Sequence, residues 1–310
     1  MLTILRPGLQ STVQDLGRPG RGAIGVPPSG AMDPLALRIA NRLVGNPDGA
    51  AALEITLGGP EIRFEIDSLV AIAGSRFESS IDDRTAPHAE SFAVTRGQVL
   101  KIGRSLEGAR AVVAVAGGID VPIVLGSRST LLGVCGGIDG RPLRSGDRIP
   151  LGRAPGELRP RRLGERVLDR YEPDCLLRVV LGPQLKAFTS AGRAAFVSAS
   201  YRMSPRSDRM GLRLEGPAIE HDGSADLLPE GIAPGAIQVP SDGQPILLGA
   251  DRPTTGGYAK IATVVVADLW RAGQVKPGDR MRFSVVSVEY ARALYRRQEE
   301  LLASAIEDVA

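Results

Sequence analysis

Frequent glycine and proline residues constrain the fold of this chain more than any other sequence feature. Glycine (38 residues) and proline (23 residues) make up about a fifth of the 310 positions and separate many short apolar segments. Both residue types interrupt regular structure, so long helices are disfavoured over most of the sequence. Short apolar runs between turn signals are typical of strands. The pattern therefore predicts a mostly β protein with a few helices.

The segments expected to be strands are apolar or alternating and are bounded by turn residues. They are residues 3–5, 53–56, 61–64, 68–73, 91–94, 99–102, 110–116, 178–181, 195–197, 246–248 and 281–286.

Helices are expected at 33–44, 262–272 and 287–306. Asp33 is a favourable N-cap for the first helix, because Pro34 follows at the first helical position. Gly273 is the predicted stop of the second helix. The third helix has a mostly apolar face opposite a charged one, and packing of that face on its own domain is favoured over membrane or partner binding.

Composition and charge exclude several function classes. The net charge is only +3, and the arginines are scattered without a basic block, which disfavours nucleic-acid binding. Two cysteines and two histidines at unrelated positions do not form a metal-binding pattern. The apolar runs are far shorter than the roughly 20 residues of a membrane helix, and the first residues lack a signal-peptide pattern. We expect a cytoplasmic protein that binds neither metal, nucleic acid nor membrane.

Weak internal repeats suggest two related halves. LEITLGGPEI at 53–62 resembles LRLEGPAI at 212–219, and SGDRIPL at 145–151 resembles PGDRMRF at 277–283. An Arg-, Pro- and Gly-rich stretch lies between them. The predicted organisation is an N-terminal half at 1–158, a linker at 159–172, and a C-terminal half at 173–310 that ends in the third helix.

Residues 240–262 concentrate polar chemistry in one short span. Polar turns between apolar elements often carry binding or catalysis, and a double glycine lets backbone approach a ligand closely. Lysine is rare in this chain, which makes the lysine of this span more noteworthy. The residues alone leave a functional site and an ordinary loop equally open. The candidates are Asp251, Thr254, Thr255, Gly256, Gly257, Tyr258 and Lys260.

Residues 8–33 consist mostly of turn-forming residues and end at the cap of the first predicted helix. Gly-rich backbone at a helix N-terminus can bind an anion, although a structural wrap around the N-terminal half is favoured. Neither a P-loop nor a Rossmann glycine pattern occurs in the sequence. The polar candidates are Gln14, Asp15, Arg18, Ser29 and Asp33.

Three further residues are candidates for binding. Arg128 lies between two serines in GSRST at 126–130, where it can clamp a carboxylate or phosphate or simply form a surface salt bridge. Arg209 would share a strand face with Arg213, either as a small cationic patch or as a solvated face. His221 is a possible general base, but a structural role is favoured for a lone histidine.

Several longer motifs together resemble one family. The chain is similar to the biotin-dependent carboxyltransferase / allophanate hydrolase subunit 2 family, which includes the C subunit of 5-oxoprolinase and KipA. The resemblance covers about residues 8 to 283 and implies two cyclophilin-like β-barrel halves. The matching pieces are QSTVQDLGRPG, GVPPSGAMDPLALRIANRLVGN, ALEITLGGPEIRFE, AVAGGIDVP, GSRST, GRPLRSGD, RMGLRLEGP, EGIAPGAIQVPSDGQPILL and TTGGYAKIATV.

The resemblance also implies an activity shared with partners. In the 5-oxoprolinase complex the C subunit acts with the A subunit and with a KipI-like B subunit, and the complex converts 5-oxo-L-proline to L-glutamate with ATP. We therefore expect this chain to be a component of a hydrolase and to be inactive alone. Its substrate is expected to be a small amide. ATP is expected to bind to the complex, and not necessarily to this chain.

Two alternatives stay open. One is carboxyl transfer from carboxybiotin to urea or a related amide, with biotin carried by another protein because no lysine here follows a methionine. The other is a non-catalytic, KipA-like regulator that binds a KipI-like kinase inhibitor.

The resemblance carries site residues onto this sequence. Asp251 and residues 254–260 match the GGY-containing motif and are the predicted lining of the reaction centre. Lys260 is expected to hold a carboxylate or phosphoryl oxygen, and Asp251 to orient or deprotonate an amide nitrogen. Residues 254–258 are expected to bind substrate, as are Arg128, Arg209 and His221. The sequence departs from the family pattern at LLGVCGG after GSRST and at 77–91.

Overall fold

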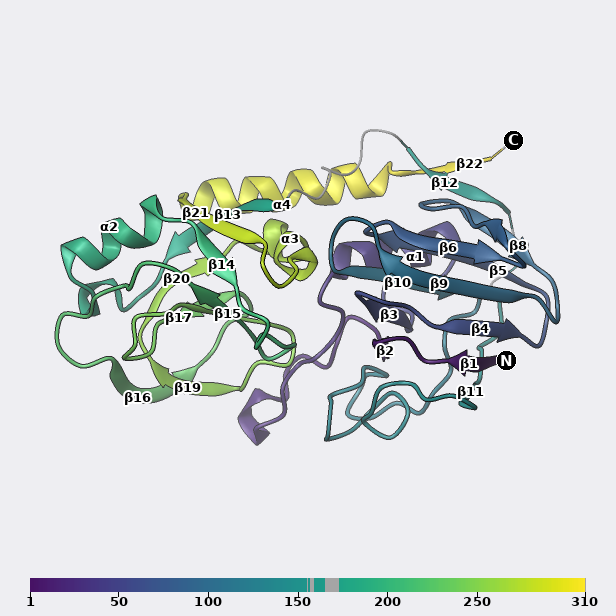
Figure 1. Ribbon diagram of the computed structural model, residues 1–310, viewed down its shortest axis with the longest axis horizontal. Helices are drawn as coiled ribbons and strands as arrows, with labels where there is room; N and C mark the ends of the chain where they lie inside the picture. The colour runs from purple at the N-terminus through teal and green to yellow at the C-terminus, as the bar shows by residue number, and fades with distance from the viewer. Residues whose placement is uncertain (155, 157–158, 165–172, 310) are drawn as a thin grey trace. The chain divides into compact units, whose positions relative to one another are not determined.

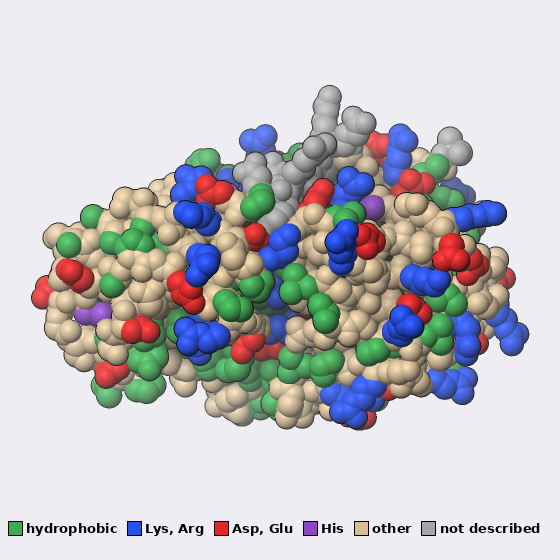
Figure 2. Space-filling view, in the orientation of Figure 1, with side chains coloured by type: hydrophobic (Ala, Val, Ile, Leu, Met, Phe, Trp, Pro, Cys, Tyr) green, Lys and Arg blue, Asp and Glu red, His purple; other side chains and the backbone are tan. Residues whose placement is uncertain are grey.

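The computed structural model describes residues 1–154, 156, 159–164 and 173–309. Over these residues the chain is mostly β with a few helices, as Figure 1 shows, which confirms the expected fold class. On the face drawn in Figure 2, cationic and anionic side chains are interspersed. Among the described residues, no helix is long and apolar enough to cross a membrane.

The chain divides into two compact units, each discontinuous in sequence. Unit 1 comprises Met1–Arg18, Ser29–Arg170 and Glu300–Ala310, and unit 2 comprises Pro19–Pro28 and Tyr171–Glu299. Part of the expected linker, residues 165–172, lies outside the described residues. The boundaries expected from sequence therefore stay a prediction.

Two antiparallel sheets build unit 1, and their apolar faces share one core. Leu2 and Phe64 of the first sheet and Leu53 and Val113 of the second are fully buried in this cluster. The first sheet has the order β11 (Arg148–Ile149), β1 (Leu2–Arg6), β4 (Glu61–Phe64), β9 (Val99–Ser105), β6 (Phe77–Ile81) and β7 (Arg84–Thr85). The second has the order β2 (Gln10–Gln14), β3 (Ala52–Thr56), β10 (Arg110–Val115), β5 (Ser68–Gly74) and β8 (Ser91–Val94).

The first predicted helix is confirmed as α1 (Pro34–Leu43) in unit 1. The Asp33 carboxylate accepts a hydrogen bond from the Ala36 backbone N–H at 2.8 Å, so Asp33 is the N-cap, as expected. Unit 1 also pairs β12 (Arg161–Leu163) with β22 (Ile306–Asp308). Residues near the C-terminus therefore return to unit 1 and pair with part of the stretch expected to be a linker.

A closed barrel of seven strands forms the body of unit 2. Leu177, Ile261 and Met281 are fully buried there. The Phe196 ring of α2 (Ser190–Ser198) stacks on Phe283 with ring centroids 4.6 Å apart. The strand order is β13 (Asp174–Leu181), β20 (Lys260–Val264), β17 (Ala236–Gln238), β18 (Ile246–Leu248), β15 (Gly211–Glu215), β14 (Tyr201–Met203) and β21 (Arg280–Val285). A separate antiparallel pair joins β16 (Asp226–Gly231) to β19 (Thr255–Tyr258).

Two secondary-structure expectations are wrong. Residues 195–197 lie in α2 instead of a strand, because the Thr189 side chain caps a helix by accepting from the Gly192 N–H at 2.9 Å. The helix expected at 262–272 begins late, since β20 occupies its first part and pairs with β13 and β17 on both sides. Helical structure there is limited to η3 (Val266–Asp268) and α3 (Leu269–Gln274), so Gly273 lies inside a helix. The third expected helix is confirmed as α4 (Val288–Ala303), but it ends before Ile306, which begins β22. Leu302 is its only buried residue, so the expected packing of a whole apolar face does not occur among the described residues.

Candidate functional site

The 240–262 segment of unit 2 crosses from the barrel to the β16–β19 pair. β18 and β20 are barrel strands, whereas β19 between them carries the double glycine. A Cβ on Gly256 would lie 2.7 Å from Ile232 Cδ1, and one on Gly257 would lie 2.9 Å from the Leu227 carbonyl oxygen. Close packing of β19 therefore already accounts for both glycines.

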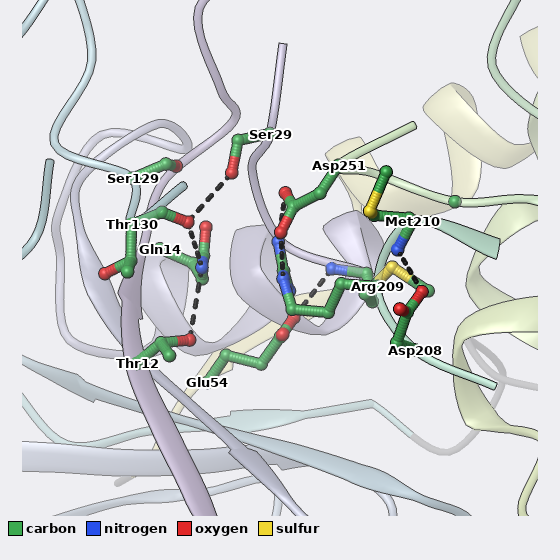
Figure 3. A network of polar contacts seen from close by, with 12 residues as sticks. Thr12, Gln14, Ser29, Glu54, Ser129, Thr130, Asp208, Arg209, Met210 and Asp251 are labelled. Carbon is green, nitrogen blue, oxygen red and sulfur yellow. Dashed lines mark hydrogen bonds and ion pairs between the residues drawn. The ribbon is translucent and has the colours of Figure 1, made fainter. Parts of the chain in front are cut away.

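Asp251 is held in a buried ion pair with Arg209 (Figure 3). Arg209 Nε and Nη2 donate to Asp251 Oδ2 and Oδ1 at 2.9 and 3.1 Å. The two residues are only 3% and 4% exposed. This two-pronged geometry is the strong form of a guanidinium–carboxylate contact. Because both oxygens accept from Arg209, Asp251 is better suited to positioning than to taking a proton.

Lys260 forms a second network in unit 2. Its Nζ lies 2.6 Å from Glu230 Oε1, and its side chain is 7% exposed against 46% for Glu230. Lys260 and Glu230 therefore form a close ion pair. Gln184 accepts from the Lys260 N–H at 3.2 Å and donates to Glu230. The interaction with Lys260 lowers the pKa of the Glu230 carboxyl.

The remaining residues of the expected reaction centre differ in exposure. Thr255 is exposed and Tyr258 is 40% exposed, so a ligand or partner can reach both. The Thr254 carbonyl accepts from the Ile232 N–H at 3.1 Å and ties this segment to the end of β16.

His221 has a structural setting in unit 2. Its Nε2 donates to the Pro240 carbonyl at 3.2 Å, and its buried Nδ1 has no hydrogen-bond partner among the described residues. The ring packs on Phe188 with centroids 4.8 Å apart.

Arg128 lies in unit 1 and holds the neighbouring loop. Its Nε donates to the Val121 carbonyl at 2.8 Å, and its Nη2 pairs with Asp120. The residues expected to bind substrate are therefore distributed over both units: Arg128 belongs to unit 1, whereas Arg209, His221 and residues 254–258 belong to unit 2.

Within unit 1, the structure joins the 8–33 motif to GSRST. Asp15 accepts from Ser127 Oγ and the Arg128 N–H, both at 2.6 Å, and also from Ser129 Oγ. Figure 3 shows Gln14 donating to Thr130 and Thr12, while Ser29 also donates to the Thr130 carbonyl. Two motifs more than 100 residues apart thus build one buried polar cluster.

The sequence did not single out three residues that contact or adjoin the candidates of unit 2: Gln184, Glu230 and Arg252. Gln184 lies outside the family motifs, and Glu230 is the first residue of EGIAPGAIQVPSDGQPILL, but neither was a candidate from the sequence. Arg252 is 7% exposed and donates to the Ile232 and Gly249 carbonyls at 3.2 and 3.3 Å. Burial lowers the pKa of its guanidinium. In the sequence, Arg252 could have been recognised because it directly follows Asp251.

Comparison with known families identifies the class of protein to which this chain belongs. Residues 24–285 match the family model described as the carboxyltransferase domain, subdomain A and B. The chain therefore belongs to this carboxyltransferase-domain family, as its motifs indicated.

Particular relatives narrow the comparison. The chain is 40% identical to the C subunit of 5-oxoprolinase from Escherichia coli, over 97% of this chain and 95% of that protein. It is 36% identical to the C subunit of 5-oxoprolinase from Haemophilus influenzae, over 96% of each chain. The crystal structure of the K. lactis urea amidolyase is similar with a TM-score of 0.93 at 34% identity. That match covers 98% of this chain but only 20% of the amidolyase chain.

Proposed function

We propose that this chain is the C subunit of an ATP-dependent 5-oxoprolinase complex that converts 5-oxo-L-proline to L-glutamate. One observation carries the proposal: the likeness to two proteins named as this component of 5-oxoprolinase extends over 95% or more of their lengths. By contrast, this chain matches only a fifth of the K. lactis urea amidolyase.

We further propose that the A subunit and a KipI-like B subunit complete the catalyst in the cytoplasm, and that this chain is inactive alone. The cations of the expected reaction centre suit ATP poorly, because Lys260 and Arg209 already pair with Glu230 and Asp251. The sequence also lacks a P-loop. We therefore assign ATP to one of the partner proteins.

For the chemistry, we propose that Lys260 stabilises negative charge on the substrate. Lactam hydrolysis adds water to the ring carbonyl, which places charge on its oxygen before the C–N bond breaks and the nitrogen takes a proton. A buried ammonium is effective against such charge, and exchange of Glu230 for the substrate would make it available. Asp251, fixed by Arg209, positions the adjoining 254–258 segment, whose exposed Thr255 and Tyr258 contact substrate.

Reconstitution tests this proposal. The chain is co-purified with its two partner proteins, the A and B subunits, and glutamate release from 5-oxo-L-proline is measured with and without ATP. We expect ATP-dependent release that disappears when this chain is omitted. Failure of the full set to release glutamate would contradict the proposal.

The likeness to urea amidolyase supports a second candidate, carboxyl transfer with biotin supplied on another protein. The same preparation is given carboxybiotin and urea. Consumption of carboxybiotin without lactam opening would favour this candidate. A KipA-like regulator would instead leave glutamate release by the two partner proteins unchanged.

A further inference from the structure

Arg252 of unit 2 is a buried cation without an acidic partner. The residue is only 7% exposed, and within the described part of the chain its guanidinium pairs with no carboxylate. Burying a charge is costly unless an opposite charge compensates it. We propose that Arg252 determines specificity by binding the carboxylate of the substrate, which on the proposed function is the carboxylate of 5-oxo-L-proline.

The protein contacts of Arg252 leave its charge uncompensated. Its Nε and Nη1 donate to the carbonyls of Ile232 and Gly249 at 3.2 and 3.3 Å, which are long contacts with neutral acceptors. The carboxylate next to it in the sequence, that of Asp251, accepts from two nitrogens of Arg209 instead. Burial lowers the pKa of the Arg252 guanidinium, and no described carboxylate acts in the opposite direction. An anionic ligand would supply the missing charge.

One nitrogen of Arg252 remains available for such a ligand. Nη2 donates to no atom in the described part of the chain, and it is not among the fully buried atoms that lack a partner. The two carbonyl contacts hold the planar guanidinium in place while Nη2 stays accessible. A donor that is already fixed loses little conformational entropy when it binds.

Arg252 is connected to the segment expected to contact substrate. Its Nε donates to the Ile232 carbonyl, while the Ile232 N–H donates to the Thr254 carbonyl at 3.1 Å. Lys260 pairs with Glu230, two residues before Ile232. Two residues of extended chain span about 7 Å. Both cations are therefore anchored to one short piece of chain at the end of β16, within unit 2 alone.

The uncompensated charge specifies the chemistry of the ligand. A guanidinium binds an anionic oxygen more strongly than a neutral one, so a carboxylate is favoured over an amide. In 5-oxo-L-proline the lactam is neutral, and the carboxylate is attached on the other side of the ring nitrogen from the lactam carbonyl. Lys260 would thus act on the lactam oxygen and Arg252 on the carboxylate. Inorganic phosphate offers similar anionic oxygens and has to be distinguished by experiment.

Binding to the reconstituted complex without ATP tests the proposal. Titrations compare 5-oxo-L-proline with 5-oxo-L-prolinamide, in which a neutral carboxamide replaces the carboxylate. The wild-type complex should bind the carboxylate form roughly 10- to 100-fold more tightly, and Arg252→Met should remove this difference. Arg213→Met removes an exposed arginine of the same unit and is the matched control, which should keep the difference. Equal loss of affinity for both lactams in Arg252→Met would indicate a purely structural role and overturn the proposal.

Arg252→Lys keeps the proposal testable if Arg252→Met does not fold. Lysine retains the positive charge but lacks the planar fork of the guanidinium. The preference for the carboxylate form should therefore fall below that of the wild type without disappearing. A preference that is unchanged in Arg252→Lys would contradict a direct contact through the guanidinium.

Inorganic phosphate, titrated into the same preparations, separates the two kinds of anion. If Arg252→Met weakens phosphate binding but the wild type does not distinguish the two lactams, the site binds phosphate and its assignment to a substrate carboxylate is wrong. These titrations do not depend on turnover. If the carboxylate form binds through Arg252 but the complex releases no glutamate, the carboxylate site stands and the proposed function fails. If the wild-type complex binds both lactams equally, the site is wrong whatever the rate of glutamate release.

Discussion

At the scale of single residues, the reaction-centre candidates of unit 2 are organised as paired charges. Arg209 pairs with Asp251 deep in the unit, and Lys260 pairs with the half-exposed Glu230. A buried pair stabilises little compared with an apolar replacement, but removing one partner leaves an uncompensated charge. The two pairs therefore make different predictions for stability and for titration.

Asp251→Asn should destabilise the protein by about 3 kcal/mol, because the buried Arg209 guanidinium loses a charged partner that it contacts through two nitrogens. The measurement is urea unfolding followed by circular dichroism. Asp242→Asn is the control, since Asp242 is exposed, and it should shift the free energy of unfolding by less than about 0.5 kcal/mol. Equal stability of the two variants would contradict the structural importance of the Arg209–Asp251 pair.

Lys260→Met should raise the pKa of Glu230 toward its ordinary value, because Lys260 is the main cause of its lowering. Carboxyl NMR titration measures the shift. Lys101→Met removes a comparable lysine that pairs with Asp83 in unit 1 and should leave the Glu230 pKa unchanged. A Glu230 pKa that stays low in Lys260→Met would refute the ion pair.

His88 should make stability depend on pH. Burial lowers its pKa, and the Arg76 charge acts in the same direction, while Glu107 and the Gly74 and Ser75 carbonyls oppose it. The unfolded chain therefore binds a proton below about pH 6.5 that the folded state resists. The free energy of unfolding should decrease as pH falls from about 7.5 to about 5.5, on either side of that value, and His88→Gln should reduce the decrease. An identical pH dependence in His88→Gln would exclude this contribution.

At the scale of elements, turn residues predicted much of unit 1. Its expected strands lie between glycines, prolines and polar turns, and they occur close to the expected bounds. In unit 2, position in the barrel decided the outcome where local pattern was ambiguous. Residues 261–264 could form a helix or a strand, and pairing with β13 and β17 favours the strand. Thr189 is a favourable N-cap, but the apolar run at 195–197 suggested a strand instead of the helix that Thr189 caps.

The closely packed Gly136 and Gly137 of unit 1 should tolerate no side chain. Gly137→Ala places a Cβ against Thr130 Oγ1 in addition to its positive φ, so overpacking should cost about 1–3 kcal/mol beyond the backbone strain. Gly97→Ala is a matched control, because Gly97 has φ +94° and open space around its Cβ position. Chemical denaturation compares the two variants, and equal destabilisation would show that the close contact has no energetic effect.

At the scale of the whole molecule, the longer sequence motifs predicted the family correctly, but they did not predict which motifs contact one another. QDLGR and GSRST were separate candidates, and only the fold of unit 1 shows that Asp15 binds both serines of GSRST. Glu230 and Gln184 escaped notice because their link to Lys260 depends on pairing between distant segments. Contacts between distant segments produce no regular spacing in the sequence, so they cannot be predicted from it.

The central claim is that this chain is an essential component of a 5-oxoprolinase. The most direct measurement is the rate of glutamate release from 5-oxo-L-proline by the A and B subunits as this chain is titrated in, with ATP present throughout. The account predicts a rate near zero without the chain and a rise that saturates at a fixed ratio of the three proteins. A rate that does not depend on the chain would contradict the claim.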